Sequence, residues 1–449
     1  MADNIREIVL DTLLTLEREN KKSHLLIREV LDKYDYLDTR DKAFFKRLSE
    51  GTISYTITLD YILNKYSSKP IEKCKPVIRA LLRMSAYQIL FMDKVPDSAV
   101  CDEAVKLCRK KSFEAFTPFV NGVLRNISKE KEKALDFSNI TDEITRLSLQ
   151  YAMPEWLVRM FKKEQPDVEA LLKGLIRIRP TCVRIVDLSQ KNVLLTKWKE
   201  MGIKVSESKY LEDAYLIEGF DGMESLPGFS EGMVIVQDES SMLAAKATGI
   251  EKGASLRVMD VCAAPGGKTS YVASKMQPNG KVLSFDVSEN KVELIRENVN
   301  RLSLENVEAN VLDATEFKEE YLESADVVIA DVPCSGLGIM ARKSDIKLNI
   351  TNEAMKEICD LQKKIISNVS RYVKKGGVLI YSTCTIHKAE NEKMVKFILD
   401  NLPFEGDSLK PYLPKVFEVE RQNEYSVQLL PNVDETDGFF VARFIKKAD

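Results

Sequence analysis

The sequence predicts a multidomain protein with an all-α N-terminal bundle, a small α/β subdomain and a C-terminal α/β domain built on a mostly parallel sheet. The chain has 449 residues, too many for one compact core. Apolar residues recur at helical spacing up to about residue 131. From about residue 234, apolar strands alternate with helical runs. We therefore expect domains over residues 1–135, 136–233 and 234–449.

The N-terminal segment reads as a helical bundle. Apolar side chains at Ile5, Ile8, Val9 and Leu13 fall on one face of a helix, and "VIRALLRMSAYQILFM" continues the pattern. The stretches "SSKP" and "KVPDS" break the pattern between helices. We interpret the leucine, methionine and phenylalanine stripes as core packing.

Residues 132–146 resemble a linker, and the material up to about residue 230 is mixed. It contains β-prone pieces such as "TCVRIVDL" and "DAYLIEGF", which favour a small α/β subdomain.

The C-terminal part carries five apolar strand candidates separated by helical runs such as "SENKVELIRENVNRL". The candidates are residues 255–261, 281–287, 307–312, 325–331 and 376–383. The tail "YSVQLLP…DGFFVARFI" is typical of a closing hairpin. Strands alternating with crossover helices predict a parallel, Rossmann-like sheet.

Composition narrows the possible chemistry. The chain is 44% hydrophobic and 30% charged, as in an ordinary globular protein. It holds no apolar run of membrane-spanning length, and its first residues are acidic and amphipathic, so we expect a cytoplasmic protein with no membrane partner. Its net charge is −3, with only a faint basic excess in the first 140 residues.

The eight cysteines include no C-x-x-C pair, which argues against a disulfide framework and a thiolate zinc site. Only two histidines are present, His24 and His387. We expect no metal, and chemistry carried by cysteine, carboxylate or lysine.

A glycine-rich loop, "MDVCAAPGGKTS", follows the first C-terminal strand and precedes a helix. Gly266 and Gly267 allow the backbone to approach a ligand closely. One interpretation is a P-loop, but Cys262 stands where the first glycine of that motif belongs. The other is a nucleoside cofactor site in a Rossmann-like sheet.

The nucleoside interpretation needs a carboxylate at the end of the next strand to bind ribose hydroxyls. Asp286 stands there, 19 residues after Gly267. Asp313, after the third strand, is placed to reach the base of the cofactor. The alternative for each aspartate taken alone is a helix cap. Successive strand ends that all offer ligand groups favour the nucleoside site over the P-loop.

Two cysteines follow neighbouring strands. Cys334 comes after Asp331 at the end of the fourth strand, and Cys384 ends the fifth. In a doubly wound sheet both thiols would open on one crevice. The other five cysteines outside the glycine-rich loop are expected to pack in cores. They are Cys74, Cys101, Cys108, Cys182 and Cys359.

Together these motifs resemble the RNA cytosine-5 methyltransferase family, within it the bacterial small-subunit (16S) ribosomal RNA enzymes with a NusB-like N-terminal domain. The likeness rests on "DVCAAPGGKT", "DVPCSG", "STCT", "VQDESSMLAAKATG" and "DGFFVARF", and in the N-terminal part on "DKAFFKRLSEG", "LLRMSAYQILFMDKVP", "DEAVKL" and "FVNGVLR".

The resemblance implies an enzyme that uses S-adenosylmethionine to methylate carbon 5 of cytosine. It assigns attack on carbon 6 to Cys384, help in product release to Cys334, and contact with the cytosine edge to Asp331. It assigns cofactor binding to Cys262, Ala263, Ala264, Pro265, Gly266, Gly267, Lys268, Asp286, Asp313 and Asp331.

The expected partner is 16S ribosomal RNA, with the target cytosine single-stranded or flipped out. We expect a monomer without an obligate protein partner. Residues 106–111, "KLCRKK", are either an RNA-binding patch or a solvated helix face. Two alternatives stay open: the same chemistry on transfer RNA, and a non-catalytic RNA-binding ribosome assembly factor.

Overall fold

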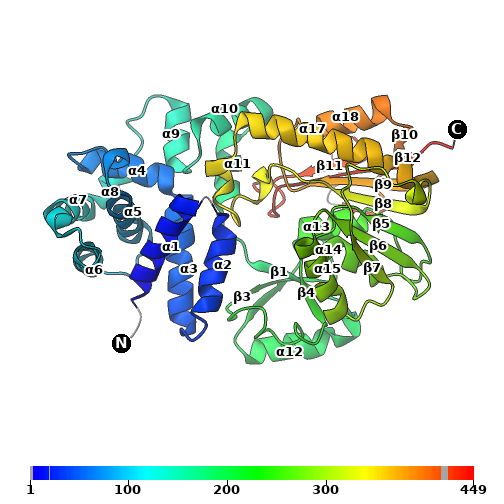
Figure 1. Ribbon diagram of the computed structural model, residues 1–449, viewed down its shortest axis with the longest axis horizontal. Coiled ribbons are helices and arrows are strands. Elements are labelled where there is room, and N and C mark those ends of the chain that lie inside the picture. The colour runs from blue at the N-terminus through cyan, green and yellow to red at the C-terminus, as the bar shows by residue number, and fades with distance from the viewer. Residues whose placement is uncertain (1–3, 20, 416–422, 449) are drawn as a thin grey trace. The chain divides into compact units, whose positions relative to one another are not determined.

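The computed structural model describes residues 4–19, 21–415 and 423–448. The chain forms two compact units (Figure 1). The helical unit comprises residues 1–176 and 340–349, and the sheet unit comprises residues 177–339 and 350–449. Among the described residues, no helix combines the length and apolarity needed to cross a bilayer.

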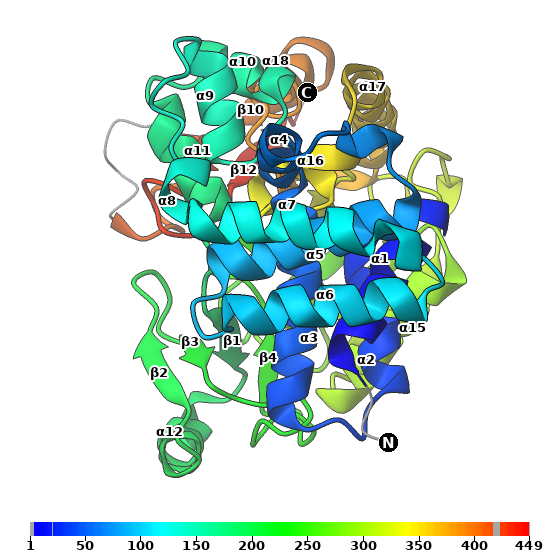
Figure 2. The same ribbon diagram turned by 90° about the vertical axis from the view of Figure 1, so that its left-hand side faces the viewer.

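The helical unit confirms the predicted N-terminal bundle. Its helices are α1 (Ile5–Glu19), α2 (Ser23–Lys33), α3 (Thr39–Ser54), α4 (Thr56–Tyr66), α5 (Pro76–Phe91), α6 (Asp97–Lys110), α7 (Thr117–Lys129), α8 (Lys131–Ala134), α9 (Glu143–Gln150), α10 (Glu155–Glu164), α11 (Val168–Ile176) and α16 (Ile346–Asn349). Figure 2 shows α5, α6 and α7 side by side.

One apolar core joins these helices. Val9 of α1, Leu48 of α3, Leu81 of α5 and Leu124 of α7 are fully buried in the same cluster. Burial of such stripes, rather than intrinsic propensity, provides most of the stability of helices this short. The start of α3 is capped by Asp38, whose side chain accepts a hydrogen bond from the Asp41 amide.

Helices α3 and α5 approach closely at a glycine. A Cβ atom at Gly51 would lie 2.0 Å from Cζ of the Tyr87 ring, so only glycine permits this packing. Gly122 of α7 faces open space instead, with no atom within 4 Å of such a Cβ.

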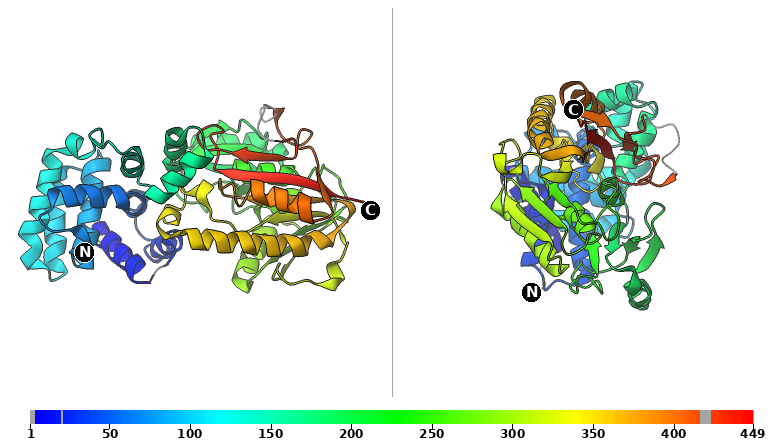
Figure 3. Two further views of the ribbon diagram at one scale, coloured as in Figure 1. Left: turned by 90° about the horizontal axis from the view of Figure 1, so that it is seen from above. Right: turned by 90° about the vertical axis from the view of Figure 1, so that its right-hand side faces the viewer.

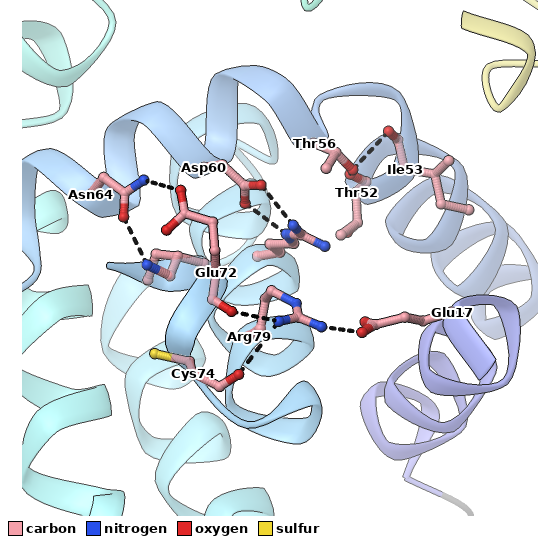
Figure 4. Close-up of polar contacts among 11 residues, drawn as sticks. Glu17, Thr52, Ile53, Thr56, Asp60, Asn64, Glu72, Cys74 and Arg79 are labelled. Carbon is pink, nitrogen blue, oxygen red and sulfur yellow. Dashed lines mark hydrogen bonds and ion pairs between the residues drawn. The ribbon is translucent and has the colours of Figure 1, made fainter. Parts of the chain in front are cut away.

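Ion pairs tie α1, α4 and α5 together around the polar side of this bundle (Figure 4). The guanidinium of Arg83 donates two hydrogen bonds of 2.6 Å to the carboxylate of Asp60. Arg79 pairs with Glu17, and the Asn64 amide donates to Glu72. The positive charges of α5 are thus balanced within the unit.

The sheet unit begins with a small antiparallel sheet of order β2-β3-β1-β4. Its elements are β1 (Thr181–Ile185), β2 (Lys204–Glu207), β3 (Ala214–Glu218), β4 (Val234–Val236) and the helix α12 (Lys191–Glu200). The predicted β-prone pieces form β1 and β3. Trp198 of α12 is fully buried and donates its indole N–H to the carbonyl of Pro227 at 3.0 Å.

The larger sheet has the order β10-β12-β9-β8-β5-β6-β7, with β11 paired to β12. Its strands are β5 (Arg257–Asp260), β6 (Lys281–Asp286), β7 (Val307–Val311), β8 (Ala325–Asp331), β9 (Val373–Thr383), β10 (Phe404–Gly406), β11 (Ser426–Leu429) and β12 (Phe439–Lys446). The run from β7 to β9 is parallel, and β12 is antiparallel to β9. All five predicted strands and the closing hairpin are present, which confirms the predicted fold class.

Helices cover both faces of this sheet. They are α13 (Glu239–Lys246), α14 (Gly267–Ala273), α15 (Glu289–Arg301), α17 (Asn352–Val369) and α18 (Glu392–Asn401). Val327 and Ile329 of β8 pack in the cluster that contains α13 and α14, whereas Val328 and Ala330 pack with α17 and α18. The view from above in Figure 3 shows the yellow α17 and orange α18 with the red C-terminal strands.

The two units are not continuous in sequence. Helices α9 to α11 complete the helical unit, and residues 340–349 return to it from the middle of the sheet unit. The division into domains at residues 135 and 233 stays a prediction.

Candidate active site

The glycine-rich loop lies between β5 and α14. Gly266 adopts φ +99°, a left-handed conformation that favours glycine. The Ala263 amide donates to the Phe285 carbonyl at 2.8 Å, and the Ala264 amide donates to the Asp286 carboxylate at 3.1 Å. The end of β6 therefore fixes the loop.

A cavity of about 390 Å³ opens at the carboxyl ends of the strands. It brings together Cys262 and Ala264 of the loop with the three aspartates Asp286, Asp313 and Asp331. Its remaining wall consists of Val261, Val287, Lys291, Leu312, Ala314, Thr315, Pro333, Leu361 and Ile365. The predicted strand ends that carry these aspartates therefore meet at one cavity. Its volume is in the range of small-molecule binding sites.

The carboxylates in this cavity are held as hydrogen-bond acceptors. Asp286 is buried and pairs with Lys291 at 2.9 Å. Asp313 accepts from the amide and hydroxyl of Thr315 at 2.8 and 2.7 Å, and these bonds hold the pKa of Asp313 below its usual value. Partial desolvation raises the pKa of the half-buried Cys262 thiol, so this cysteine stays neutral.

A second cavity of about 220 Å³ lies against the other side of the loop. It is lined by Gly267, Lys268, Asp260, Gln237 and Asp331, among others. Burial raises the pKa of Asp260 to about 7. Among the described residues, the buried Asp260 Oδ1 atom and both amide atoms of Gln237 have no hydrogen-bond partner. Both residues lie within quoted motifs, Asp260 in "MDVCAAPGGKTS" and Gln237 in "VQDESSMLAAKATG", but no pattern in the sequence distinguished them from their neighbours.

Asp331 borders both cavities and connects the loop with the end of β9. Its Oδ2 atom accepts a hydrogen bond from Lys268 Nζ at 2.6 Å, and its Oδ1 atom accepts from Ser382 Oγ at 2.7 Å. Lys268 is buried and also donates to Ser241 Oγ at 3.0 Å. A fixed acceptor at this point can orient a planar polar ligand.

The two cysteines singled out in the sequence lie together. Strands β8 and β9 are parallel neighbours with Asp331 opposite Ser382, so the residues that follow them leave the sheet side by side. Cys334 Sγ and Cys384 Sγ are 3.2 Å apart. The thiol–thiol hydrogen bond and burial raise the pKa of Cys334 well above its usual value. Cys334 is therefore a neutral thiol that can donate its proton toward Cys384.

A buried polar network behind the two thiols escaped the sequence analysis. Glu390 is fully buried and accepts hydrogen bonds from the amide and hydroxyl of Ser335 and from Gln362. Burial raises the pKa of Glu390, and these hydrogen bonds oppose the shift. Its sequence context, "HKAENEK", looks like an exposed charged loop, so only the fold shows its burial.

The other cysteines and the basic run behave differently from the site residues. Cys74, Cys101, Cys108 and Cys182 are buried, and Cys359 is half-buried.

The basic side chains of the 106–111 run are each within 4.0 Å of an acidic group: Lys106 near Glu103, Arg109 near Glu114, Lys110 near Glu7, and Lys111 near Glu7 and Asp11. These pairings favour the solvated helix face over an RNA-binding patch.

Two protein families and several relatives match this chain. The family described as 16S rRNA methyltransferase RsmB/F matches residues 250–445, and the NusB family matches residues 3–129. The chain is 35% identical over 452 residues to the probable ribosomal RNA small subunit methyltransferase B of Bacillus subtilis (strain 168), covering 99% of each chain. It is 28% identical to the protein of the same description from Synechocystis sp., again over 99% of each.

Solved structures of other proteins have a fold similar to that of this chain. The crystal structure of PH0851 superimposes with a TM-score of 0.80 at 24% identity, covering 99% of this chain and 100% of that one. A methyltransferase homolog protein from Pyrococcus horikoshii gives a TM-score of 0.56 at 25% identity, over 68% of this chain and 100% of its own. The first likeness establishes the fold alone.

Proposed function

Because the chain belongs to the 16S rRNA methyltransferase RsmB/F family, an S-adenosylmethionine-dependent group, we propose that it methylates carbon 5 of one cytosine through a covalent bond to Cys384. The observation that carries this proposal is the 3.2 Å separation of Cys334 Sγ and Cys384 Sγ beside the carboxylate-lined cavity. A small-subunit ribosomal RNA is the proposed substrate, because the relatives are named for it.

The cavity suits S-adenosylmethionine. Asp286 and Asp313 are acceptors for hydroxyl and amine donors, and the apolar side chains of Leu312 and Ile365 provide a wall for a planar base. Residues 262–268 would hold the rest of the molecule. When bound, S-adenosylmethionine supplies an electrophilic methyl group.

Carbon 5 of cytosine is a poor nucleophile, so it must be activated. In the proposed mechanism the Cys384 thiolate adds to carbon 6, the electron pair of the carbon 5–carbon 6 double bond moves to carbon 4–carbon 5, and the ring nitrogen takes up a proton. The product is an enamine with a nucleophilic carbon 5. Asp331, held by Lys268 and Ser382, would contact the polar edge of the base. The ring nitrogen of cytosine is an acceptor, and a proton given to it by the Asp331 carboxyl group would neutralise the negative charge that develops there as carbon 6 is attacked.

Release of the product requires cleavage of the bond between Cys384 and carbon 6. After methylation the carbon 5 proton passes to a base or to water, the carbon 6–sulfur bond breaks, and the electron pair of that bond returns to Cys384 as a thiolate. The ring nitrogen then returns its proton to Asp331. The neutral Cys334 thiol can donate a hydrogen bond to this sulfur, 3.2 Å away. A donor at this distance lowers the energy of the leaving thiolate, which supports Cys334 as the residue that assists release.

The proposal is tested by bisulfite sequencing of 16S ribosomal RNA from cells with and without the gene. We expect one cytosine to lose its protection from deamination in the deleted strain and to regain it with the wild-type chain but not with Cys384→Ala. Protection that is unchanged in the deleted strain would rule out the proposed activity. Protection lost from a transfer RNA instead would identify the alternative substrate.

A further inference from the structure

Two adjacent residues, Glu390 and Asn391, form hydrogen bonds with the residues that flank the two cysteines. Both side chains are buried, with 0% and 1% of their surfaces exposed. They precede α18 and follow Cys384 by six and seven residues. Neither has an assigned part in the reaction described above.

Glu390 holds the residues on both sides of Cys334. Its carboxylate accepts from the Ser335 amide at 2.9 Å and from the Ser335 hydroxyl at 2.5 Å. It also accepts from Gln362 of α17 at 3.1 Å, and the same Gln362 amide donates to the Pro333 carbonyl at 2.9 Å. The backbone before and after Cys334 is therefore anchored to one buried carboxylate.

Asn391 holds the residues on both sides of Cys384. Its Oδ1 atom accepts from the Thr383 hydroxyl at 2.6 Å, and its Nδ2 atom donates to the Thr385 carbonyl at 3.0 Å. Nδ2 also donates to Gln428 Oε1 at 2.7 Å. The amide uses both its acceptor and its donor atoms, so its orientation is fixed by the network.

One hydrogen bond joins the two halves. The Ser335 hydroxyl has a single proton, which it gives to Glu390, so the Thr385 hydroxyl must donate to Ser335 Oγ at 2.8 Å. Ser335 follows Cys334 and Thr385 follows Cys384. The bond therefore links the two cysteine-bearing segments one residue after each thiol.

From this geometry we propose that Glu390 and Asn391 are separate positioning residues, Glu390 for the release thiol Cys334 and Asn391 for the nucleophile Cys384. The inference rests on the proposed roles of the two cysteines. A fully satisfied buried network keeps its members in one arrangement, and a shift of about 1 Å in a reacting group can cost about 100-fold in rate.

The test compares two isosteric variants on purified enzyme with 16S ribosomal RNA and S-adenosylmethionine. Glu390→Gln replaces an acceptor by a donor that faces donors, and Asn391→Asp replaces a donor by an acceptor that faces carbonyl oxygens. We expect Glu390→Gln to accumulate a covalent protein–RNA adduct on a denaturing gel, as Cys334→Ala does, with kcat reduced about 100-fold and KM for RNA unchanged. We expect Asn391→Asp to prevent adduct formation, as Cys384→Ala does.

The partly exposed Glu392, which pairs with Lys388, provides the matched control, and Glu392→Gln should behave as wild type. A purely structural role would change adduct formation and release together in both variants, and that result would overturn the inference. Wild-type behaviour of Glu390→Gln and Asn391→Asp would also overturn it.

If Glu390→Gln or Asn391→Asp fails to fold, two milder variants test the same inference. Ser335→Ala removes only the bridging hydroxyl, and Thr383→Val removes only the donor to Asn391. The first should raise the adduct fraction and the second should lower it; no change in either would refute the inference. If Cys334→Ala accumulates adduct but Glu390→Gln does not, this inference fails while the proposed function stands. If the wild type produces no 5-methylcytosine, the proposed function itself fails.

Discussion

Cys334 and Cys384 face one another across 3.2 Å, although 50 residues separate them in the chain. The contact arises because β8 and β9 are parallel neighbours whose carboxyl ends lie at the same edge of the sheet. Two thiols at one sheet edge allow one to make a bond to the substrate and the other to assist its cleavage.

The division of labour between these thiols is the first prediction. Cys384→Ala should abolish the covalent protein–RNA adduct, because no sulfur remains in position to attack carbon 6. Cys334→Ala should trap the adduct, because the leaving sulfur loses its donor. A denaturing gel with labelled RNA measures both. Adduct in Cys384→Ala but not in Cys334→Ala would mean that the roles are exchanged.

The ribose assignment of Asp286 is the second prediction. Asp286→Ala removes a charged acceptor and also the partner of the Ala264 amide in the loop. We expect the Kd for S-adenosylmethionine to rise by about 10- to 100-fold, since a hydrogen bond to a charged group contributes about 1.5–3 kcal/mol. Titration calorimetry measures this change. Glu308→Ala removes an exposed carboxylate of β7 that pairs with Lys281 of β6; this variant is the control and should bind S-adenosylmethionine normally.

The third prediction concerns pH. Burial raises the pKa of Asp260 from 3.8 to about 7, so the folded state holds this proton more tightly than the unfolded chain does. The stability linked to Asp260 is complete below pH 3.8 and is lost as pH rises toward 7. The upper limit of this loss is about 4 kcal/mol.

Asp260→Asn has no such proton to lose. Urea unfolding of the wild type and this variant between about pH 5 and pH 7.5 should therefore show the wild type losing stability relative to the variant. Parallel stability curves would contradict the pKa shift at this position.

The close approach of α3 and α5 gives the fourth prediction. Gly51→Ala forces a methyl group against the Tyr87 ring and should lower the free energy of unfolding by about 1–3 kcal/mol. Gly122→Ala, in open space on α7, should raise it by about 0.5–1 kcal/mol through helix propensity. Chemical denaturation of both variants measures the difference. A loss of stability in both would mean that the contact with Tyr87 is not the cause.

Much of the sheet unit follows from the sequence. Apolar runs such as residues 325–331 have the length and β-branched content of buried strands, and strand ends in a parallel sheet converge by geometry. That is why Asp286 and Asp313 could be expected at one cavity from the sequence, whereas the expectation for Asp331 came from the family resemblance.

Long-range burial of polar residues could not be predicted in this way. Glu390 and Asn391 are as polar as the exposed residues around them, and only the packing of α17 and β9 decides that they are buried. The basic run at 106–111 presents the opposite case. Its charges left an RNA-binding patch and a solvated helix face both open, because the acidic neighbours Glu7 and Asp11 come from α1, about 100 residues away.

The excursion of residues 340–349 sets a limit on how the protein can be divided. This segment starts six residues after Cys334, packs with the helical unit, and contains the buried Lys347. A chain that begins at residue 177 would leave these ten residues without their packing partners. It would also expose Lys347, which is buried in the complete fold. The methyltransferase half is thus not a free-standing module, and a single cut cannot separate it from its N-terminal companion.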